Sequence, residues 1–110
     1  MILISSKYLV PNGFRSITLF PFIFLKYEGD KLNNVLINHE KIHTRQQLEL
    51  FILPFFIWYL LEYVSNFIKY RDKNLAYRNI SFEREAYFHE NDMNYLNKRS
   101  LWAFILFLKK

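Results

Sequence analysis

The fold is decided by residues 32–43, which read LNNVLINHEKIH. In this stretch the apolar residues and the histidines recur at intervals of three and four, the period of one face of an α-helix. These residues are Leu32, Val35, Leu36, His39, Ile42 and His43. The chain stays compatible with a helix until Pro54, which lacks a backbone donor and should end or kink it. We therefore predict one long helix over residues 32–53.

Two histidines on this helix, His39 and His43, enclose the sequence His-Glu-Lys-Ile-His. Side chains at positions i and i+4 lie one above the other on a helix, so both imidazoles can reach one tetrahedral ion. Glu40 projects about 100° away around the axis, beside such an ion, where it can take a proton from metal-bound water. The plainer interpretation is an exposed polar helix face that carries these residues without a metal.

A third metal ligand must come from elsewhere in the chain, because a catalytic zinc ion keeps three protein ligands and one water. The sequence contains no cysteine, so this ligand is a histidine or a carboxylate, and thiolate sites are excluded. The candidates lie on a later predicted helix and are Glu83, Glu85, His89 and Glu90. From the residues alone, the choice among them stays open.

The N-terminal part of the chain is expected to form a short antiparallel pair of strands. Two β-prone runs, residues 2–10 and residues 17–27, are separated by Pro11-Asn12-Gly13, a strong turn signal. Pro21 lies inside the second run and cannot donate to a ladder, so this strand should lie at an edge or break there. The predicted architecture is therefore a β-hairpin followed by three or four helices.

Three helical segments are expected after Pro54. The first covers residues 55–69, and Asp72-Lys73-Asn74 marks a connection after it. The second covers residues 82–96 with Ser81 as its cap. The third covers the apolar residues 101–108 before Lys109 and Lys110, which is typical of a packed terminal helix or a membrane-surface anchor.

Composition and charge limit the classes of protein that fit. The 110 residues fit a single domain, 1–110, and a hydrophobic content of 52% excludes a disordered chain. The net charge of +5 comes from scattered Lys and Arg without a recognisable nucleic-acid-reading element, so we expect no nucleic-acid partner. The N-terminus lacks the features of a secretory signal, which predicts a location in the cytoplasm or at its face of the membrane.

A membrane span is not expected in the most apolar part of the chain. The uninterrupted apolar run covers residues 50–61 and is bracketed by Glu49 and Glu62. A spanning helix needs about 20 predominantly apolar residues, which this run does not reach. Because basic residues flank the apolar stretches, we expect peripheral contact with an anionic membrane surface.

The segment Phe82-Glu83-Arg84-Glu85-Ala86-Tyr87 resembles the Glu-x-x-Ala-Asp signature of gluzincins, the zinc peptidases whose third ligand is a glutamate. The resemblance implies that Glu83 is this ligand and that Ala86 allows two helices to approach closely. It departs from the signature at Tyr87, where many gluzincins have an aspartate that supports a zinc-bound histidine. That support must then come from another residue or from a backbone carbonyl.

Residues 38–96 resemble a group of short, uncharacterised bacterial zincin-like proteins with the pattern HExxHxxQ, Pro, FExEA. The metzincin alternative is set aside, because it requires Gly and His where this chain has Gln46 and Glu49. The resemblance implies a minimal zincin-like α+β fold, mostly α-helical. Larger zincins bind substrate along an edge strand above the motif helix and against a second lobe, and here only residues 1–27 could form such a strand.

The function that follows from the resemblance is zinc-dependent hydrolysis of peptide bonds in a peptide or protein substrate. His39, His43 and Glu83 would hold one Zn²⁺ ion, and Glu40 would act as the general base. Gln46 and Tyr87 are candidates for positioning a ligand or stabilising an oxyanion. The alternative is a zinc-stabilised scaffold or membrane-surface binding protein that keeps the same ligands without turnover.

Overall fold

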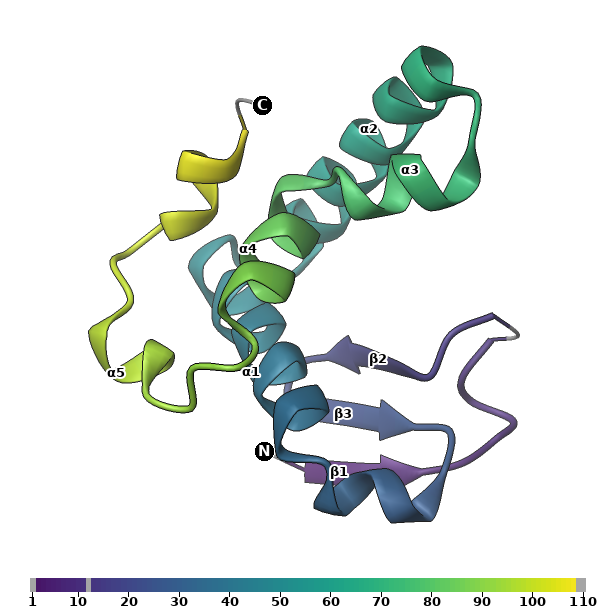
Figure 1. Ribbon diagram of the computed structural model, residues 1–110, viewed down its shortest axis with the longest axis vertical. Coiled ribbons are helices and arrows are strands. Elements are labelled where there is room, and N and C mark those ends of the chain that lie inside the picture. Colours follow the sequence, from purple (N-terminus) through teal and green to yellow (C-terminus); the bar gives the residue numbers. More distant parts are fainter. Residues whose placement is uncertain (1, 12, 109–110) are drawn as a thin grey trace.

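The computed structural model describes residues 2–11 and 13–108 and separates a small sheet from a set of helices (Figure 1). The strands are β1 (Ile2–Ser5), β2 (Ser16–Leu19) and β3 (Phe22–Leu25). The α-helices are α1 (Asn34–Glu49), α2 (Leu53–Tyr70), α3 (Lys73–Arg78), α4 (Ser81–His89) and α5 (Tyr95–Lys98). Two 3₁₀ helices, η1 (Glu28–Leu32) and η2 (Ala103–Phe107), complete the chain. The predicted α+β, mostly α-helical class is therefore confirmed.

The sheet has the strand order β1-β3-β2, and its pairing differs from the predicted hairpin. Strands β2 and β3 pair antiparallel, with Thr18 opposite Ile23, whereas β1 and β3 pair in parallel, with Ile4 opposite Phe24. The antiparallel pair thus forms inside the second predicted run, because Pro21 divides that run into two strands, as expected. The prediction that the two runs pair antiparallel is wrong. Asn12 of the predicted turn lies outside the described residues.

Helix α1 is shorter at its C-terminal end than the sequence suggests. It begins after Asn33, whose side chain accepts a hydrogen bond from the backbone of Leu36, and it ends at Glu49. Phe51 and Ile52 then adopt positive φ angles of 61° and 66°, and the chain turns into α2. Pro54 lies in the first turn of α2 and does not end α1. A proline is tolerated there because the first helical N–H groups have no partner inside the helix.

The C-terminal half contains more, and shorter, helices than predicted. The expected connection after α2 is helix α3, whose N-terminus is capped by the Asp72 carboxylate. Helix α4 ends at His89, so residues 82–96 do not form one helix. Ser81 begins α4 without capping it, since its backbone N–H and hydroxyl donate to the Glu62 carboxylate. The predicted final helix is η2, and Lys109 and Lys110 lie outside the described residues.

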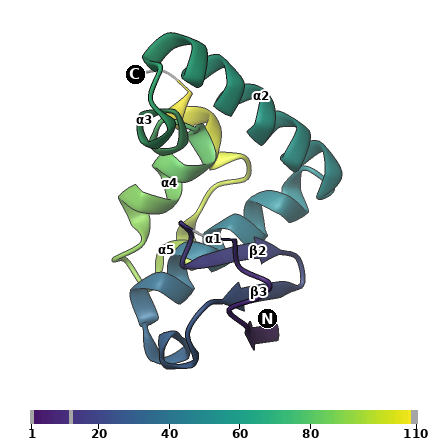
Figure 2. The ribbon, with the colours of Figure 1, turned by 90° about the vertical axis from the view of Figure 1, so that its right-hand side faces the viewer.

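The core brings α4 against α1. One apolar cluster is formed by Phe55, Ile80, Phe82 and Phe104, and a second by Ile42, Ala86 and Tyr95. Ala86 and Ile42 are fully buried, and the small alanine lets α4 approach α1 closely. The opposite side of α1 packs on the sheet, mainly on β2 (Figure 2). Helix α1 therefore lies between β2 and α4, and both supply side chains to the site described below.

Helix α2 follows α1 after a sharp turn and lies along one side of the molecule (Figure 2). Among the described residues, no single helix combines the length and the apolar character needed to cross a bilayer. Helices α1 and α2 meet those criteria only as a pair, and this pair is bent by 112° at the break between them.

Candidate metal centre

Three candidate ligand atoms from two helices form a nearly regular triangle. The Nε2 atoms of His39 and His43 on α1 are 3.2 Å apart. The Oε1 atom of Glu83 on α4 lies 3.2 Å from the first and 3.1 Å from the second. Ligand atoms about 2.0–2.1 Å from a tetrahedral zinc ion are about 3.3–3.4 Å apart, so the triangle matches one face of such a tetrahedron.

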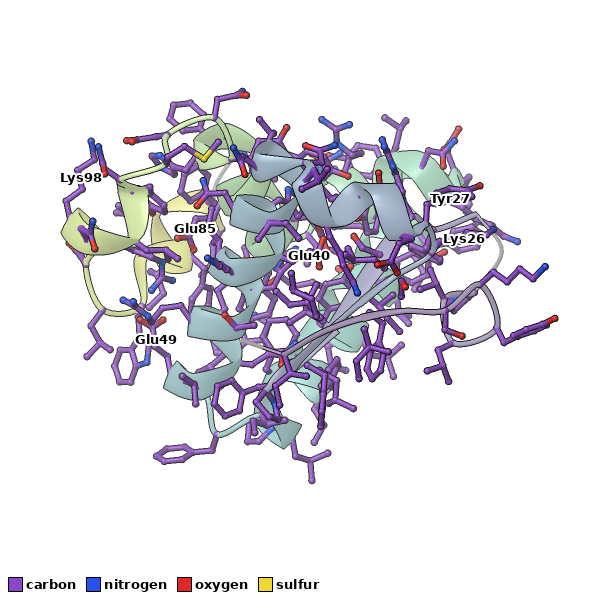
Figure 3. The ribbon with its side chains drawn as sticks, turned by 90° about the horizontal axis from the view of Figure 1, so that it is seen from below. Lys26, Tyr27, Glu40, Glu49, Glu85 and Lys98 are labelled. Atoms are coloured by element: carbon purple, nitrogen blue, oxygen red, sulfur yellow. The ribbon has the colours of Figure 1, made fainter. Side chains whose placement is uncertain are left out.

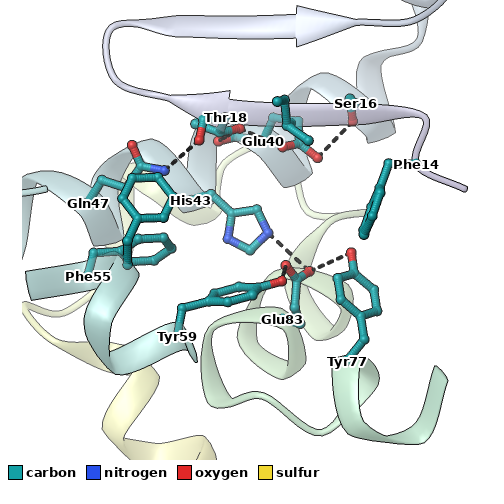
Figure 4. A pocket seen from close by; sticks show the side chains of 12 residues that line it. Phe14, Ser16, Thr18, Glu40, His43, Gln47, Phe55, Tyr59, Tyr77 and Glu83 are labelled. Atoms are coloured by element: carbon teal, nitrogen blue, oxygen red, sulfur yellow. Dashed lines mark hydrogen bonds and ion pairs between the residues drawn. The ribbon is translucent and has the colours of Figure 1, made fainter. Parts of the chain in front are cut away.

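Glu40 offers a second way to complete a metal site, but its geometry places it beside the triangle. Its carboxylate and the two imidazoles present ligand atoms within 4.8 Å of one another, and this buried group could hold a metal ion. Yet Glu40 Oε2 lies 4.0 Å from His39 Nε2, farther than Glu83 Oε1 does. The hydroxyls of Ser16 and Thr18 on β2 also donate to the Glu40 carboxylate (Figure 4). Glu83 is therefore the better placed of the two carboxylates to complete a site with the two histidines.

Both histidines are oriented through their other ring nitrogen. His39 Nδ1 lies 2.8 Å from Glu90 Oε1, and His43 Nδ1 lies 2.8 Å from Gln46 Oε1. The Gln46 amide nitrogen donates to the Phe82 carbonyl and to Glu85, which turns the amide oxygen toward His43. Each Nδ1 thus acts as an N–H donor, and in a neutral imidazole the Nε2 lone pair faces the other ligand atoms. Glu90 supplies the carboxylate support that the tyrosine at position 87 cannot give.

Of the four candidates for the third ligand, only Glu83 contributes an atom to the triangle. Glu85 lies on the other side of the α1–α4 contact, where it pairs with Arg99 and accepts a hydrogen bond from Tyr95. His89 stacks on the Tyr95 ring with 3.7 Å between the ring centres. Glu90 contacts Nδ1 of a histidine rather than Nε2.

Two tyrosines that sequence reasoning did not single out contact the centre. The Tyr59 hydroxyl on α2 donates to Glu83 Oε2 at 2.8 Å, and the Tyr77 hydroxyl on α3 donates to Glu83 Oε1 at 3.1 Å. Tyr87, the tyrosine proposed from sequence, packs its ring against His39 and places its hydroxyl 3.4 Å from that of Tyr77. No spacing in the sequence links Tyr59 or Tyr77 to the motif, because they reach it from separate helices.

The centre is electrostatically suited to a cation. Burial lowers the pKa of His43, but the carboxylates of Glu83 and Glu40 raise it, with the net result of about 9. Burial raises the pKa of Glu83, but the imidazoles of His43 and His39 lower it by more than burial raises it. The net result is a pKa well below the usual range of a glutamate. Within the part of the chain that the structure describes, neither Glu40 nor Glu83 pairs with a lysine or arginine.

Burial, followed by the charge of Glu83, raises the pKa of Tyr59 and of Tyr77. Both hydroxyls therefore stay protonated at neutral pH and act as hydrogen-bond donors toward the centre. Each tyrosine hydroxyl thus donates a hydrogen bond to an oxygen atom of Glu83.

A cavity of about 220 Å³ opens beside Glu40, His43 and Glu83 (Figure 4). Its other walls are mainly apolar and aromatic, and they come from the segment before β2, from β2 itself and from the helices α1, α2 and α3. They consist of Phe14, Ser16, Ile17, Thr18, Gln47, Phe55, Phe56, Tyr59 and Tyr77. A wider cleft next to it is lined by His39, Glu40 and Glu90, among other residues. The centre is therefore reachable from solvent although its ligand atoms are buried.

Comparison of the chain with protein-family models, with curated proteins and with solved structures gave no match. The structure defines a buried group of His39, Glu40 and His43 that could hold a metal ion. It also places the Glu83 carboxylate within 3.2 Å of both imidazoles, next to a cavity lined by Glu40, His43 and Glu83.

Proposed function

We propose that the protein is a zinc-dependent metallopeptidase with a minimal zincin-like fold, in which His39, His43 and Glu83 hold one zinc ion. The triangle of ligand atoms with edges of 3.1–3.2 Å carries this proposal. Two imidazole nitrogens and one carboxylate oxygen form a donor set typical of catalytic zinc, which leaves the fourth position open. The Nδ1 contacts to Glu90 and Gln46 supply the outer support that such ligands need.

Glu40 is the general base in this proposal. A zinc ion in the triangle would polarise a substrate carbonyl and lower the pKa of a water molecule there to about 7. The Glu40 carboxylate accepts the proton of the attacking water and then delivers it to the leaving amine. Hydrogen bonds from Ser16 and Thr18 hold this carboxylate beside the ligand triangle and prevent it from turning away.

Tyr77 is the donor that stabilises negative charge on the substrate oxygen. Its hydroxyl lies 3.1 Å from Glu83 Oε1, at one corner of the ligand triangle, and stays protonated because its pKa is raised. A donor placed where charge develops stabilises the transition state more than the ground state. Tyr59, which donates to the other oxygen of Glu83, is a positioning residue that fixes the orientation of this carboxylate.

The substrate is a polypeptide with a large apolar residue next to the cleaved bond. Strand β2 is an edge strand that lies over α1, so an extended peptide can add to its free edge and pass Glu40. The cavity of about 220 Å³ beside Glu40 is walled by Phe14, Ile17 and Phe55, which favours an apolar side chain.

The test of the proposed function combines metal analysis with a single conservative variant. Protein purified without an affinity tag should contain about one zinc ion per chain. Glu40→Gln should keep the zinc and lose about 10²- to 10⁴-fold of the peptide hydrolysis, because an amide cannot accept the proton of the water. Glu28→Gln, the same change at an exposed position, should keep both. Equal hydrolysis by Glu40→Gln and the parent on every cleaved peptide would exclude this mechanism.

A zinc-stabilised scaffold without turnover is the alternative, and one observation favours it. The centre joins α1 and α4 directly and contacts α2 and α3 through Tyr59 and Tyr77. An ion at this place would link four helices and stabilise the fold. Such a scaffold would require the ligands but not Glu40, so the Glu40→Gln variant separates the two functions.

A further inference from the structure

The outer side of α2 is a continuous apolar surface. Six of its large apolar side chains are 46–67% exposed, namely Leu53, Ile57, Leu60, Leu61, Val64 and Ile68. At about 100° per residue they fall within an arc of about 100°, and no charged residue of α2 lies in this arc. We call these six residues the apolar face. Among the described residues, no other helix or strand covers this outer side of α2 (Figure 2).

The charges near the apolar face complement an anionic surface. Lys69, Arg71 and Lys73 are exposed at the C-terminal end of α2 and just beyond it, and the whole chain has a net charge of +5. The acidic Glu62 of α2 is turned inward, where it accepts hydrogen bonds from Ser81. An apolar stripe with cations next to it is the pattern of a helix that lies in the plane of an anionic membrane.

A second copy of the chain fits the apolar face less well than a lipid surface does. A standard protein interface uses about 20–30 residues on each side, many more than the six of the apolar face. A lipid surface needs only one helix, and the 18 residues of α2 give a length of about 27 Å. Two copies with the same net positive charge would also repel each other.

We propose that α2 docks the protein on an anionic lipid bilayer, with the apolar face inserted among the lipids and the helix axis in the membrane plane. Leu60 of the apolar face and the neighbouring Phe56 also line the wider cleft, together with His39 and Glu40. Docking therefore places this cleft at the bilayer surface. Where the proposed peptidase function holds, and this step rests on it, the substrates are polypeptides presented at a membrane.

The experiment is co-sedimentation of the zinc-loaded protein with vesicles. Vesicles of phosphatidylcholine and phosphatidylglycerol in equal amounts should carry the protein down, and vesicles of phosphatidylcholine alone should bind it much more weakly. Leu61→Glu should weaken binding to the anionic vesicles about ten-fold or more, because it places a charge where an apolar side chain inserts. Leu32→Glu, at an 86% exposed leucine of η1, is the matched control and should bind like the parent.

Two results would overturn membrane docking. One is equal binding of Leu61→Glu and the parent to the anionic vesicles, or no binding by either. The other is a dimer in solution that Leu61→Glu converts to a monomer, which would assign the apolar face to self-association. Unchanged zinc content and thermal unfolding of Leu61→Glu would show that this variant is folded.

The vesicle assay needs no turnover, so it separates the two proposals. If the protein binds vesicles but cleaves no peptide, the membrane-docking proposal is supported and the peptidase proposal is contradicted. If it cleaves free peptides but does not bind vesicles, the peptidase proposal is supported and the membrane-docking proposal is contradicted. If both proposals hold, the parent should cleave a peptide anchored to anionic vesicles faster than the free peptide, and Leu61→Glu should lose this preference.

Discussion

Two glutamates of α4, Glu83 and Glu85, are separated by one residue and are both buried, yet their surroundings differ in kind. Glu85 is paired with the guanidinium of Arg99, and the Tyr95 hydroxyl and Gln46 amide complete its hydrogen bonds. Glu83 contacts two imidazoles and two tyrosine hydroxyls. Figure 3 shows Glu85 and Glu49 toward the C-terminal segment and Glu40 toward the strands.

The difference lies in the cation opposite each carboxylate. Arg99 is permanently charged and pairs with both Glu85 and Glu49, so each of these carboxylates already faces a fixed cation and the cluster serves as an internal link. The partners of Glu83 carry a positive charge only when an imidazole is protonated. Burial of a carboxylate therefore does not mark a metal site by itself. In the proposed centre, the imidazole and carboxylate atoms converge without a permanent cation.

Exchange of the two carboxylates for amides should give the largest contrast. Glu83→Gln should reduce zinc affinity by more than the 10- to 100-fold that loss of an outer partner typically costs. Glu85→Gln should keep the zinc but lower the free energy of unfolding by about 3 kcal/mol, because it weakens a buried ion pair. Zinc titration and denaturant unfolding of both variants measure the two effects. Loss of zinc in Glu85→Gln alone would reverse the assignment.

The tyrosines of the two clusters sharpen the same comparison. Tyr77 donates to Glu83 and Tyr95 donates to Glu85. Tyr77→Phe should lower kcat for peptide hydrolysis by about 10²-fold or more while the zinc content stays unchanged. Tyr95→Phe should leave kcat close to that of the parent and affect stability only. Steady-state kinetics on a cleaved peptide separates these outcomes when the zinc content of each preparation is also measured. Equal kcat values in the two variants would contradict the proposed role of Tyr77.

The Glu83 and Glu85 clusters should also differ in their dependence on pH. This effect, seen in the zinc affinity, should be smaller than the effects of the substitutions above. In the metal-free protein the pKa of His43 is about 9, above its ordinary value of 6.5, so zinc must displace a proton from it below pH 9. Zinc affinity should therefore rise by up to about ten-fold per pH unit from pH 6.5 to pH 9. Titrations with buffers of different ionisation enthalpy count the released proton. A flat affinity over this range would contradict the raised pKa of His43.

The sign of the stability change follows from the same pKa shifts. A raised pKa of His43 stabilises the metal-free fold below pH 6.5, and this contribution is lost as the pH rises through about 9. The lowered pKa of Glu83 stabilises the fold above pH 4.5, the ordinary pKa of a glutamate, and this stabilisation is lost as the pH falls below that value. The pair is thus most stabilising between pH 4.5 and pH 6.5. The Glu85–Arg99 pair does not titrate between pH 6.5 and pH 9, because the pKa of Arg99 is raised and that of Glu85 is lowered.

Local sequence spacing predicted the part of the centre that lies on one helix. The interval of four residues between His39 and His43 requires only helical geometry, so the convergence of the two imidazoles could be anticipated. The resemblance to the gluzincin signature indicated Glu83. The Nδ1 partner Glu90 and the donors Tyr59 and Tyr77 could not be anticipated, because tertiary packing alone brings them to the site.

The fold was predicted to a similar extent. The helical motif and the break at Pro21 depend on local chemistry, and both are present. Strand β1 pairs in parallel with β3, which leaves an edge available on the side away from β2. The residues of β1 alone do not specify this partner strand. The end of α1 at Glu49 was missed for a related reason. A proline fits the first turn of a helix as well as it ends one, so Pro54 alone did not show which helix it belonged to.

The most direct measurement is a crystal structure of the zinc-loaded protein with anomalous scattering recorded at the zinc absorption edge. One anomalous peak should lie about 2.0–2.1 Å from the Nε2 atoms of His39 and His43 and about 2.0–2.2 Å from a carboxylate oxygen of Glu83. Glu40 should remain hydrogen-bonded to Ser16 and Thr18, outside bonding distance of the metal. A peak bound by Glu40 in place of Glu83, or no peak between the two histidines, would contradict the proposed centre.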